Sequence, residues 1–236
     1  MDVSILHQHS DVHVERRIRR FVKALVSTLI VVSIGTAAAG DNGVSLSYEE
    51  FREIVLEQHK ITLSDARKAL RNKSEADLFS SINFFVAGSP TPEAIHLLEA
   101  VWGNETDKYP ELPWPILNRP VVRLGIAQTL GRLDPDPAYR DYALTQTRSK
   151  DEVVAGHAVF ALGLIGNDDD VQLLKGYSKS GSMYVSKQAI YGLAALGTKK
   201  SKDALTELGA ESQGDATRIA IIDEAGSIFS SNIRKK

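Results

Sequence analysis

Three copies of one helical pattern dominate the second half of the chain. The segment at residues 122–133, Val-Arg-Leu-Gly-Ile-Ala-Gln-Thr-Leu-Gly-Arg-Leu, returns in related form at residues 154–165 and 185–196. The copies begin 32 and 31 residues apart, and a degenerate fourth copy starts near Ala216. Helical units of this period cannot bury their apolar face alone and must stack on their neighbours. The spacing therefore restricts this half of the chain to stacked helical hairpins.

Each repeat contains a second predicted helix between the copies. Val122, Ile126 and their counterparts are expected to share one continuous core. The small residues Gly131, Gly163 and Ala194 occupy positions where paired helices approach closely. The second helices are expected near residues 137–148, 169–179 and 201–208.

Residues 40–103 are also predicted to form helices. Ser47 to Glu50 is a capping-box pattern, and further helix starts stand at Thr62, Ser74 and Thr91, the last followed by a proline. No stretch before residue 120 shows the sustained alternation of a β-strand. We therefore predict an all-α fold, in which these N-terminal helices are either a separate group or diverged repeats.

The repeated pattern Val-x-x-x-Ala-x-x-x-Leu-Gly-x-Leu/Ile resembles HEAT repeats of the short bacterial type, which also occur in phycobilisome lyase subunits. The resemblance covers about residues 118–230, so the repeat region is placed at residues 120–236. It implies a right-handed α-α superhelix whose usual role is to hold another macromolecule. It does not imply a reaction.

Residues 1–39 have the layout of a secretory signal peptide. A basic cluster from Arg16 to Lys23 precedes an uncharged run from Ala24 to Ala39, and the small residues Ala37 to Ala39 suit cleavage before Gly40. The run is shorter than the roughly 20 residues of a membrane-spanning helix. We therefore expect export to a bacterial periplasm or the medium, with an uncleaved membrane anchor as the alternative.

Composition excludes several classes of function. The net charge is −2, which gives no electrostatic reason to expect nucleic acid as the partner. The chain has no cysteine, and no phosphate-binding loop, dinucleotide fingerprint or serine-nucleophile elbow is present. Asn167 to Asp170 lacks the spacing of a calcium loop and is interpreted as a helix cap. We expect no catalytic residue, metal or cofactor.

The candidate partner site is the face of the repeated helix opposite the core. Exposed aromatic side chains grouped on such a face are suited to bind a protein or peptide. The alternative is that Phe160 and Leu164 pack under a neighbouring helix. The predicted contact residues on this face are Arg132, His157, Phe160, Leu164, Tyr184, Gln188 and Tyr191.

A proline- and aromatic-rich insertion at residues 104–119 separates the N-terminal helices from the repeats. Proline fixes φ and lacks an N–H group, so this stretch is expected to be ordered but largely non-helical. Trp102, Tyr109 and Trp114 form either an aromatic lip over the groove or part of a loop that plugs the end of the solenoid, with Trp114 capping exposed core.

The sequence thus favours an exported, non-catalytic protein that holds a protein or peptide partner in a concave groove, as an inhibitor, an immunity protein or an envelope adaptor. The alternative, by analogy with the HEAT repeats of bilin lyases, is a small-ligand-binding or lyase-like enzyme subunit. Binding to a membrane is expected only if the N-terminal segment is uncleaved. The sequence leaves the oligomeric state open.

Overall fold

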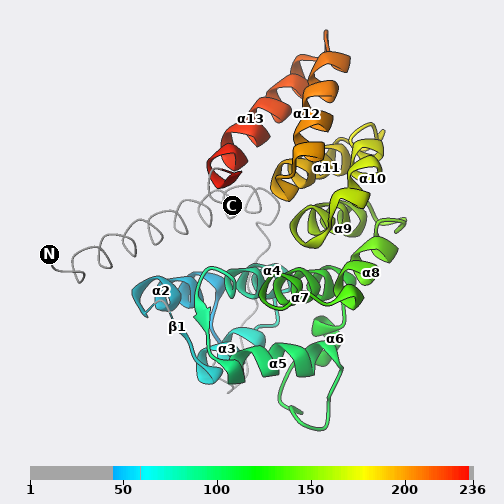
Figure 1. The fold of residues 1–236 in the computed structure, drawn as a ribbon. Helices are drawn as coiled ribbons and strands as arrows, with labels where there is room; N and C mark the ends of the chain where they lie inside the picture. Colours follow the sequence, from blue (N-terminus) through cyan, green and yellow to red (C-terminus); the bar gives the residue numbers. More distant parts are fainter. Residues whose placement is uncertain (1–44, 59, 234–236) are drawn as a thin grey trace, which may run out of the picture.

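The computed structural model describes residues 45–58 and 60–233 (Figure 1). The predicted leader, residues 1–39, lies outside the described residues. Two very short strands, β1 (Lys60–Ile61) and β2 (Ser89–Pro90), pair in parallel. The helices are α2 (Tyr48–Gln58), α3 (Leu63–Leu70), α4 (Glu75–Phe84), α5 (Pro92–Trp102), α6 (Trp114–Leu117), α7 (Pro120–Leu133), α8 (Pro137–Gln146), α9 (Glu152–Ile165), the 3₁₀ turn η2 (Asp168–Asp170), α10 (Val171–Tyr177), α11 (Met183–Leu196), α12 (Lys199–Glu211) and α13 (Ala216–Ile233).

The helices begin where the capping residues predicted them. The backbone N–H of Ser47 donates to the Glu50 carboxylate at 2.8 Å, and the Ser47 hydroxyl accepts from the Glu50 N–H. Thr62 caps α3 in a full capping box, and Thr91 caps α5 with a proline at its first turn. These caps satisfy N–H groups that a helix leaves without an intrahelical partner.

The helices alternate between two rows. The helices between the repeated copies, α8, α10 and α12, lie with α3 and α5 in what we name the A row. The helices that carry the repeated pattern, α7, α9 and α11, lie with α4 and α13 in the B row. Each B helix packs on its neighbours in the row, from α4 through α13, and α2 packs on α4 at one end (Figure 1). The all-α solenoid of stacked hairpins is confirmed, and the N-terminal helices continue both rows.

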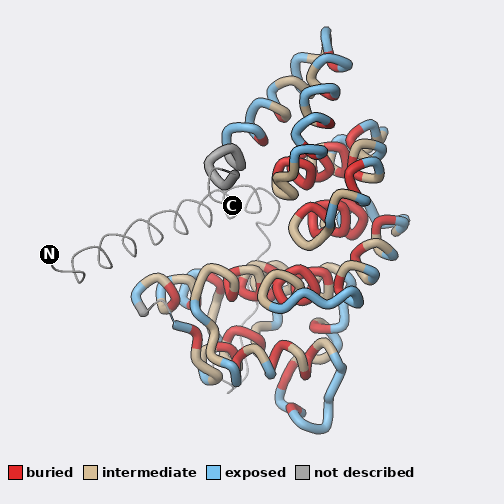
Figure 2. The backbone as a smooth tube through the Cα atoms, viewed as in Figure 1, coloured by how far each residue is buried: buried red, intermediate tan, exposed pale blue. Residues whose placement is uncertain are grey.

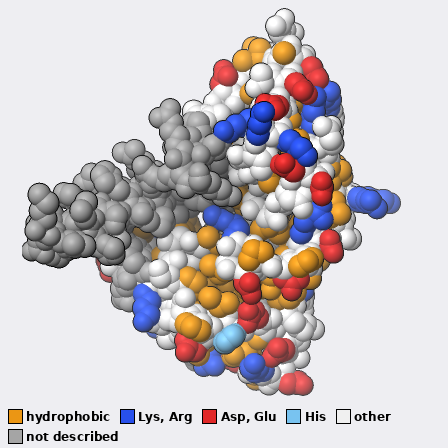
Figure 3. All heavy atoms as spheres, in the orientation of Figure 1, with side chains coloured by type: hydrophobic (Ala, Val, Ile, Leu, Met, Phe, Trp, Pro, Cys, Tyr) orange, Lys and Arg blue, Asp and Glu red, His pale blue; other side chains and the backbone are white. Residues whose placement is uncertain are grey.

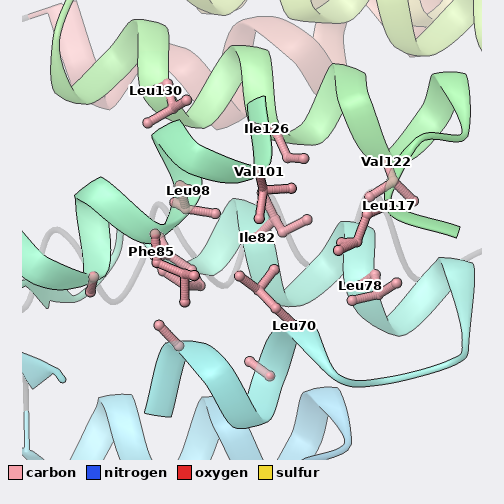
Figure 4. Close-up of a cluster of buried hydrophobic side chains, with 14 of the residues drawn as sticks. Leu70, Leu78, Ile82, Phe85, Leu98, Val101, Leu117, Val122, Ile126 and Leu130 are labelled. Carbon is pink, nitrogen blue, oxygen red and sulfur yellow. The ribbon is translucent and has the colours of Figure 1, made fainter. Parts of the chain in front are cut away.

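Large side chains fill the first of three cores. It runs from α2 to α8 and contains Phe51, Phe85 and Leu98, each fully buried. Figure 4 shows Phe85 and Leu98 in this core. Leu117 of the short helix α6 joins the same core, so part of the proline-rich insertion covers it. Figure 2 shows the buried residues concentrated where the rows meet.

The second core, which lies between α7 and α12, is built from alanine, valine and leucine, without a buried aromatic ring. The closest approach joins α9 and α11, where a Cβ atom added to Gly163 would overlap the backbone of Gly192. The prediction of close packing at Gly163 is therefore confirmed. Gly131 instead faces the side chain of Ile165 at 3.1 Å from an ideal Cβ position. A third, smaller core joins α9, α11 and α13.

Polar contacts recur at one repeat length. Arg140 of α8 donates two hydrogen bonds to Asp170, at 2.9 and 2.7 Å, and Tyr177 donates to the carbonyl of Thr147 at 3.0 Å; both pairs are 30 residues apart. Asp170 is 2% exposed and also accepts from the N–H of Asn167 at 2.9 Å. The acidic run after Asn167 is thus a helix cap and an anchor between repeats, as the cap interpretation predicted.

Candidate binding surface

The middle turns of the B helices α7, α9 and α11 are buried on every side. Uninterrupted buried runs cover residues 124–130 of α7, 158–163 of α9 and 188–194 of α11. Six or seven consecutive residues make about two helical turns, so no face of the helix is free at that level. The predicted groove face therefore serves mainly as the contact between neighbouring helices of the row.

Three of the predicted contact residues are core residues. Phe160 is 4% exposed, Gln188 is 7% exposed and Tyr191 is fully buried. Phe160 and Tyr191 pack together in the third core with residues of α13. The expectation that they are exposed anchors is wrong, because stacking covers both flanks of a B helix, whereas a single hairpin would cover only one.

Arg132 and Leu164 lie near the C-terminal ends of their helices and remain partly exposed. Leu164 packs against the third core. Burial lowers the pKa of Arg132 to about 10, so the guanidinium remains cationic at neutral pH. These two side chains are at the edge of the row and do not lie in its centre.

His157 and Tyr184 are brought together by the stacking of α9 on α11. The Tyr184 hydroxyl and His157 Nε2 are 3.2 Å apart. Burial lowers the pKa of His157 to about 4 and raises that of Tyr184 to about 12, so both are neutral at pH 7. A direct polar contact thus joins these two predicted site residues.

Trp114 lies away from the other predicted residues. Its indole N–H donates to the carbonyl of Tyr109 at 2.9 Å, and its ring packs on the first core. Trp102 stacks on Tyr139 and Tyr142 of the A-row helix α8. The aromatic-lip interpretation is therefore wrong, and the interpretation of a loop that covers core is confirmed, although the loop lies within the stack and not at its end.

The exposed apolar side chains lie at the N-terminal ends of the B helices. Among the described residues, the large hydrophobic side chains classed as exposed are Val153, at 44%, and Met183, at 53%. Their helix ends are joined by a 2.8 Å hydrogen bond from the Ser182 hydroxyl to the Glu152 carboxylate. We name Val153, Met183 and the half-buried Tyr184 the N-terminal edge.

Sequence reasoning did not single out Met183, whose side chain the structure leaves exposed. An apolar residue directly after the cap Ser182 was the available signal, since the first turn extends beyond the middle turns that the row neighbours enclose. Val153, which follows the cap Asp151 closely, was not among the predicted contact residues either.

Charges are mixed on the surface. On the face shown in Figure 3, acidic and basic side chains are interspersed. Ion pairs such as Lys175 with Glu207 and Lys179 with Glu211 join α10 and the adjoining turn to α12. Within the described ranges, no group of three potential metal ligands occurs, and no helix is long and apolar enough to cross a membrane.

The comparison with protein families agrees with the architecture. A family model described as HEAT repeats matches residues 141–225, which extend from α8 into α13. The match supports a HEAT-repeat protein over this range. HEAT repeats generally mediate protein interactions. No curated protein matches the chain, and no solved structure does.

Proposed function

We propose that this chain is a non-catalytic binding protein that holds a protein or peptide partner at the N-terminal edge of its HEAT repeats. The observation that supports the proposal is the exposure of Val153 and Met183 on neighbouring helix ends. Exposed apolar side chains rimmed by polar residues are typical of interaction sites. Tyr184 adds an aromatic ring whose ordering costs little conformational entropy.

The edge differs from the groove expected from sequence, but it uses the same helices. Met183, with its flexible thioether side chain, adapts to the shape of a partner. Glu152 and Ser182 already bond to each other, so they form a polar rim beside the apolar side chains. A partner with a small apolar segment and few charges fits this arrangement best.

We further propose export, with cleavage after Ala39, on the basis of the basic cluster and the uncharged run in residues 1–39. In an envelope compartment the partner would be a hydrolase or toxin to be inhibited, or a component of an envelope assembly. N-terminal sequencing of the protein purified from its own host tests this. A mature chain that begins at Gly40 supports export with cleavage, whereas an intact Met1 in a membrane fraction supports the anchor.

The binding proposal is tested with the full chain carrying a C-terminal tag in its own host. Met183→Glu places a charge on the edge, and Ala210→Glu, at an exposed position of α12, is the matched control. We expect the chain to co-purify with one stoichiometric protein, Met183→Glu to lose it and Ala210→Glu to retain it. Binding is then measured with the two purified proteins.

Loss of a partner at an interface anchor corresponds to about 2 kcal/mol or more, which is about thirtyfold in Kd. Unchanged helicity by circular dichroism is required of both variants. Equal binding by Met183→Glu and the parent chain would place the partner elsewhere on the repeats.

A further inference from the structure

The His157 ring lies between two aromatic rings from other helices. Its centroid is 4.5 Å from that of Phe79 in α4 and 6.1 Å from that of Tyr184 in α11. We name these three residues the His157 cluster. The repeat helix α7 packs on both α4 and α9, and the contact of Phe79 with His157 adds a direct link between the N-terminal helix α4 and α9.

Two glycines let these rings approach. A Cβ atom added to Gly125 would lie 2.9 Å from Cδ2 of Phe79, and one added to Gly156 would overlap the Tyr184 ring. Phe79 is 5% exposed. The rings of the cluster therefore pack against helix backbone as well as against side chains.

The hydrogen bonds of His157 suit only its neutral form. Nε2 is paired with the Tyr184 hydroxyl, while Nδ1 is buried and has no hydrogen-bond partner among the described residues. A neutral imidazole has one N–H donor, which the Tyr184 oxygen can accept. A protonated imidazole has two, and the second would be buried without an acceptor, which is costly.

The surrounding charges do little to offset this cost. Burial is the main effect on the pKa of His157 and lowers it from 6.5 to about 4, while Asp151 at the start of α9 opposes this weakly. Ionisable groups on the helices packed around the cluster have other contacts or remain charged throughout. On α4, Asp77 accepts from Asn72 and Glu75 pairs with Arg119; on α7, Arg123 lies over Trp102 and Arg132 remains a cation. On α11, Lys187 lies over Tyr191 near Glu224.

We propose that the His157 cluster is an acid-sensitive latch, in which protonation of the imidazole releases Phe79 of α4 from α9 and loosens the junction that α7 forms between the N-terminal helices and the later repeats. The proposal concerns the free chain and does not depend on the proposed binding function. The closed junction has its full stability above pH 6.5 and loses it as the pH falls towards 4, because the open state takes up the proton more readily.

Hydrogen exchange of the full chain at pH 7 and pH 5 tests the latch, with rates corrected for the intrinsic pH dependence of exchange. With a pKa of 6.5 in the open state and about 4 in the closed state, the opening constant rises about twentyfold over this interval. We expect the amide protection of α4 and α9 to fall by this factor, while the protection of α3 and α12 changes little.

His157→Gln, which does not titrate, should remove the difference between the two pH values. His96→Gln is the matched control, because His96 is exposed and pairs with Glu99 outside the cluster. Its pH response should equal that of the parent chain. The same response in His157→Gln as in the parent, an equal loss of protection in every helix, or no change between pH 7 and pH 5 would each overturn the latch.

If His157→Gln does not fold, an NMR titration of the imidazoles in the unaltered chain decides the matter. A His157 ring that takes up its proton near pH 6.5 while α4 stays protected contradicts the proposal. A ring that takes up its proton only as α4 loses protection supports it.

Discussion

The two halves of the molecule build the same two rows of helices from different side chains. The first core contains Phe51, Phe84 and Phe85, and the rings of Phe51 and Phe85 lie 5.4 Å apart. The second core is rich in alanine, and at its centre Gly163 meets Gly192 backbone to backbone. One architecture therefore tolerates both a core of large interlocking side chains and a core of closely spaced backbones.

The difference explains why only one half has a recognisable family pattern. Close backbone approach admits only glycine or alanine at fixed positions, so the residues are constrained and their spacing is repeated. A core of large side chains tolerates many volume-conserving substitutions, so its pattern is degenerate. The family match accordingly covers residues 141–225, while α2 to α5 continue the rows without it.

The largest effect is expected for Phe85→Ala in the first core. Phe85 is fully buried, and its truncation should lower the free energy of unfolding by about 4 kcal/mol. Phe85→Leu retains much of the volume and should cost less than half as much. Urea unfolding measures both. Equal losses would mean that the first core depends on exact shape, as the second core does.

The second-largest effect is expected at the ion pair that joins two neighbouring repeats. Arg140→Ala leaves the Asp170 carboxylate buried without its bidentate partner and should cost about 3 kcal/mol. Asp170→Asn should cost less, because the Arg140 side chain is 28% exposed and can turn towards water. The same unfolding assay applies, and a greater loss in Asp170→Asn would reverse this assignment.

A single methyl group tests the backbone contact in the second core. Gly163→Ala overlaps the Gly192 backbone and should lower the free energy of unfolding by about 2 kcal/mol. Gly176→Ala in α10 is the control, since no atom lies within 4 Å of its added Cβ. It should raise the stability by about 0.5–1 kcal/mol through helix propensity. The melting temperatures of the two variants should therefore shift in opposite directions, that of Gly163→Ala downward and that of Gly176→Ala upward.

The smallest effect is expected at the N-terminal edge. Met183→Ser removes an exposed side chain and should change the free energy of unfolding by no more than about 0.5 kcal/mol. Chemical denaturation checks this. A loss comparable to that of Phe85→Ala would show that Met183 belongs to a core and is not available to a partner.

Helix positions and the repeat period followed from local chemistry and were predicted from the sequence. The caps at Ser47, Thr62 and Thr91 mark helix starts because a side-chain oxygen beside free N–H groups acts within a few residues. Gly163 was identified because a small residue that recurs at the same position of each repeat indicates a closely packed pair of helices. The minor strand pair β1–β2 was not predicted, because two residues are too few to show alternation.

The candidate site was predicted less well. The predicted contact residues included His157 and Tyr184, which do meet. They also included Phe160, Gln188 and Tyr191, which are buried. A helical face that is apolar and aromatic looks the same in sequence whether it meets a partner or the next helix of its own chain. Met183 was not singled out, because a single exposed residue produces no periodic pattern.

The sequence by itself determined the helices, their caps, the repeat length and hence the all-α stack, because these depend on residues close together in the chain. The tertiary structure alone decided which faces remain accessible, that Arg140 meets Asp170, and that Phe79 reaches His157. These contacts depend on how each hairpin rotates against the next, and that rotation is set by packing between residues tens of positions apart.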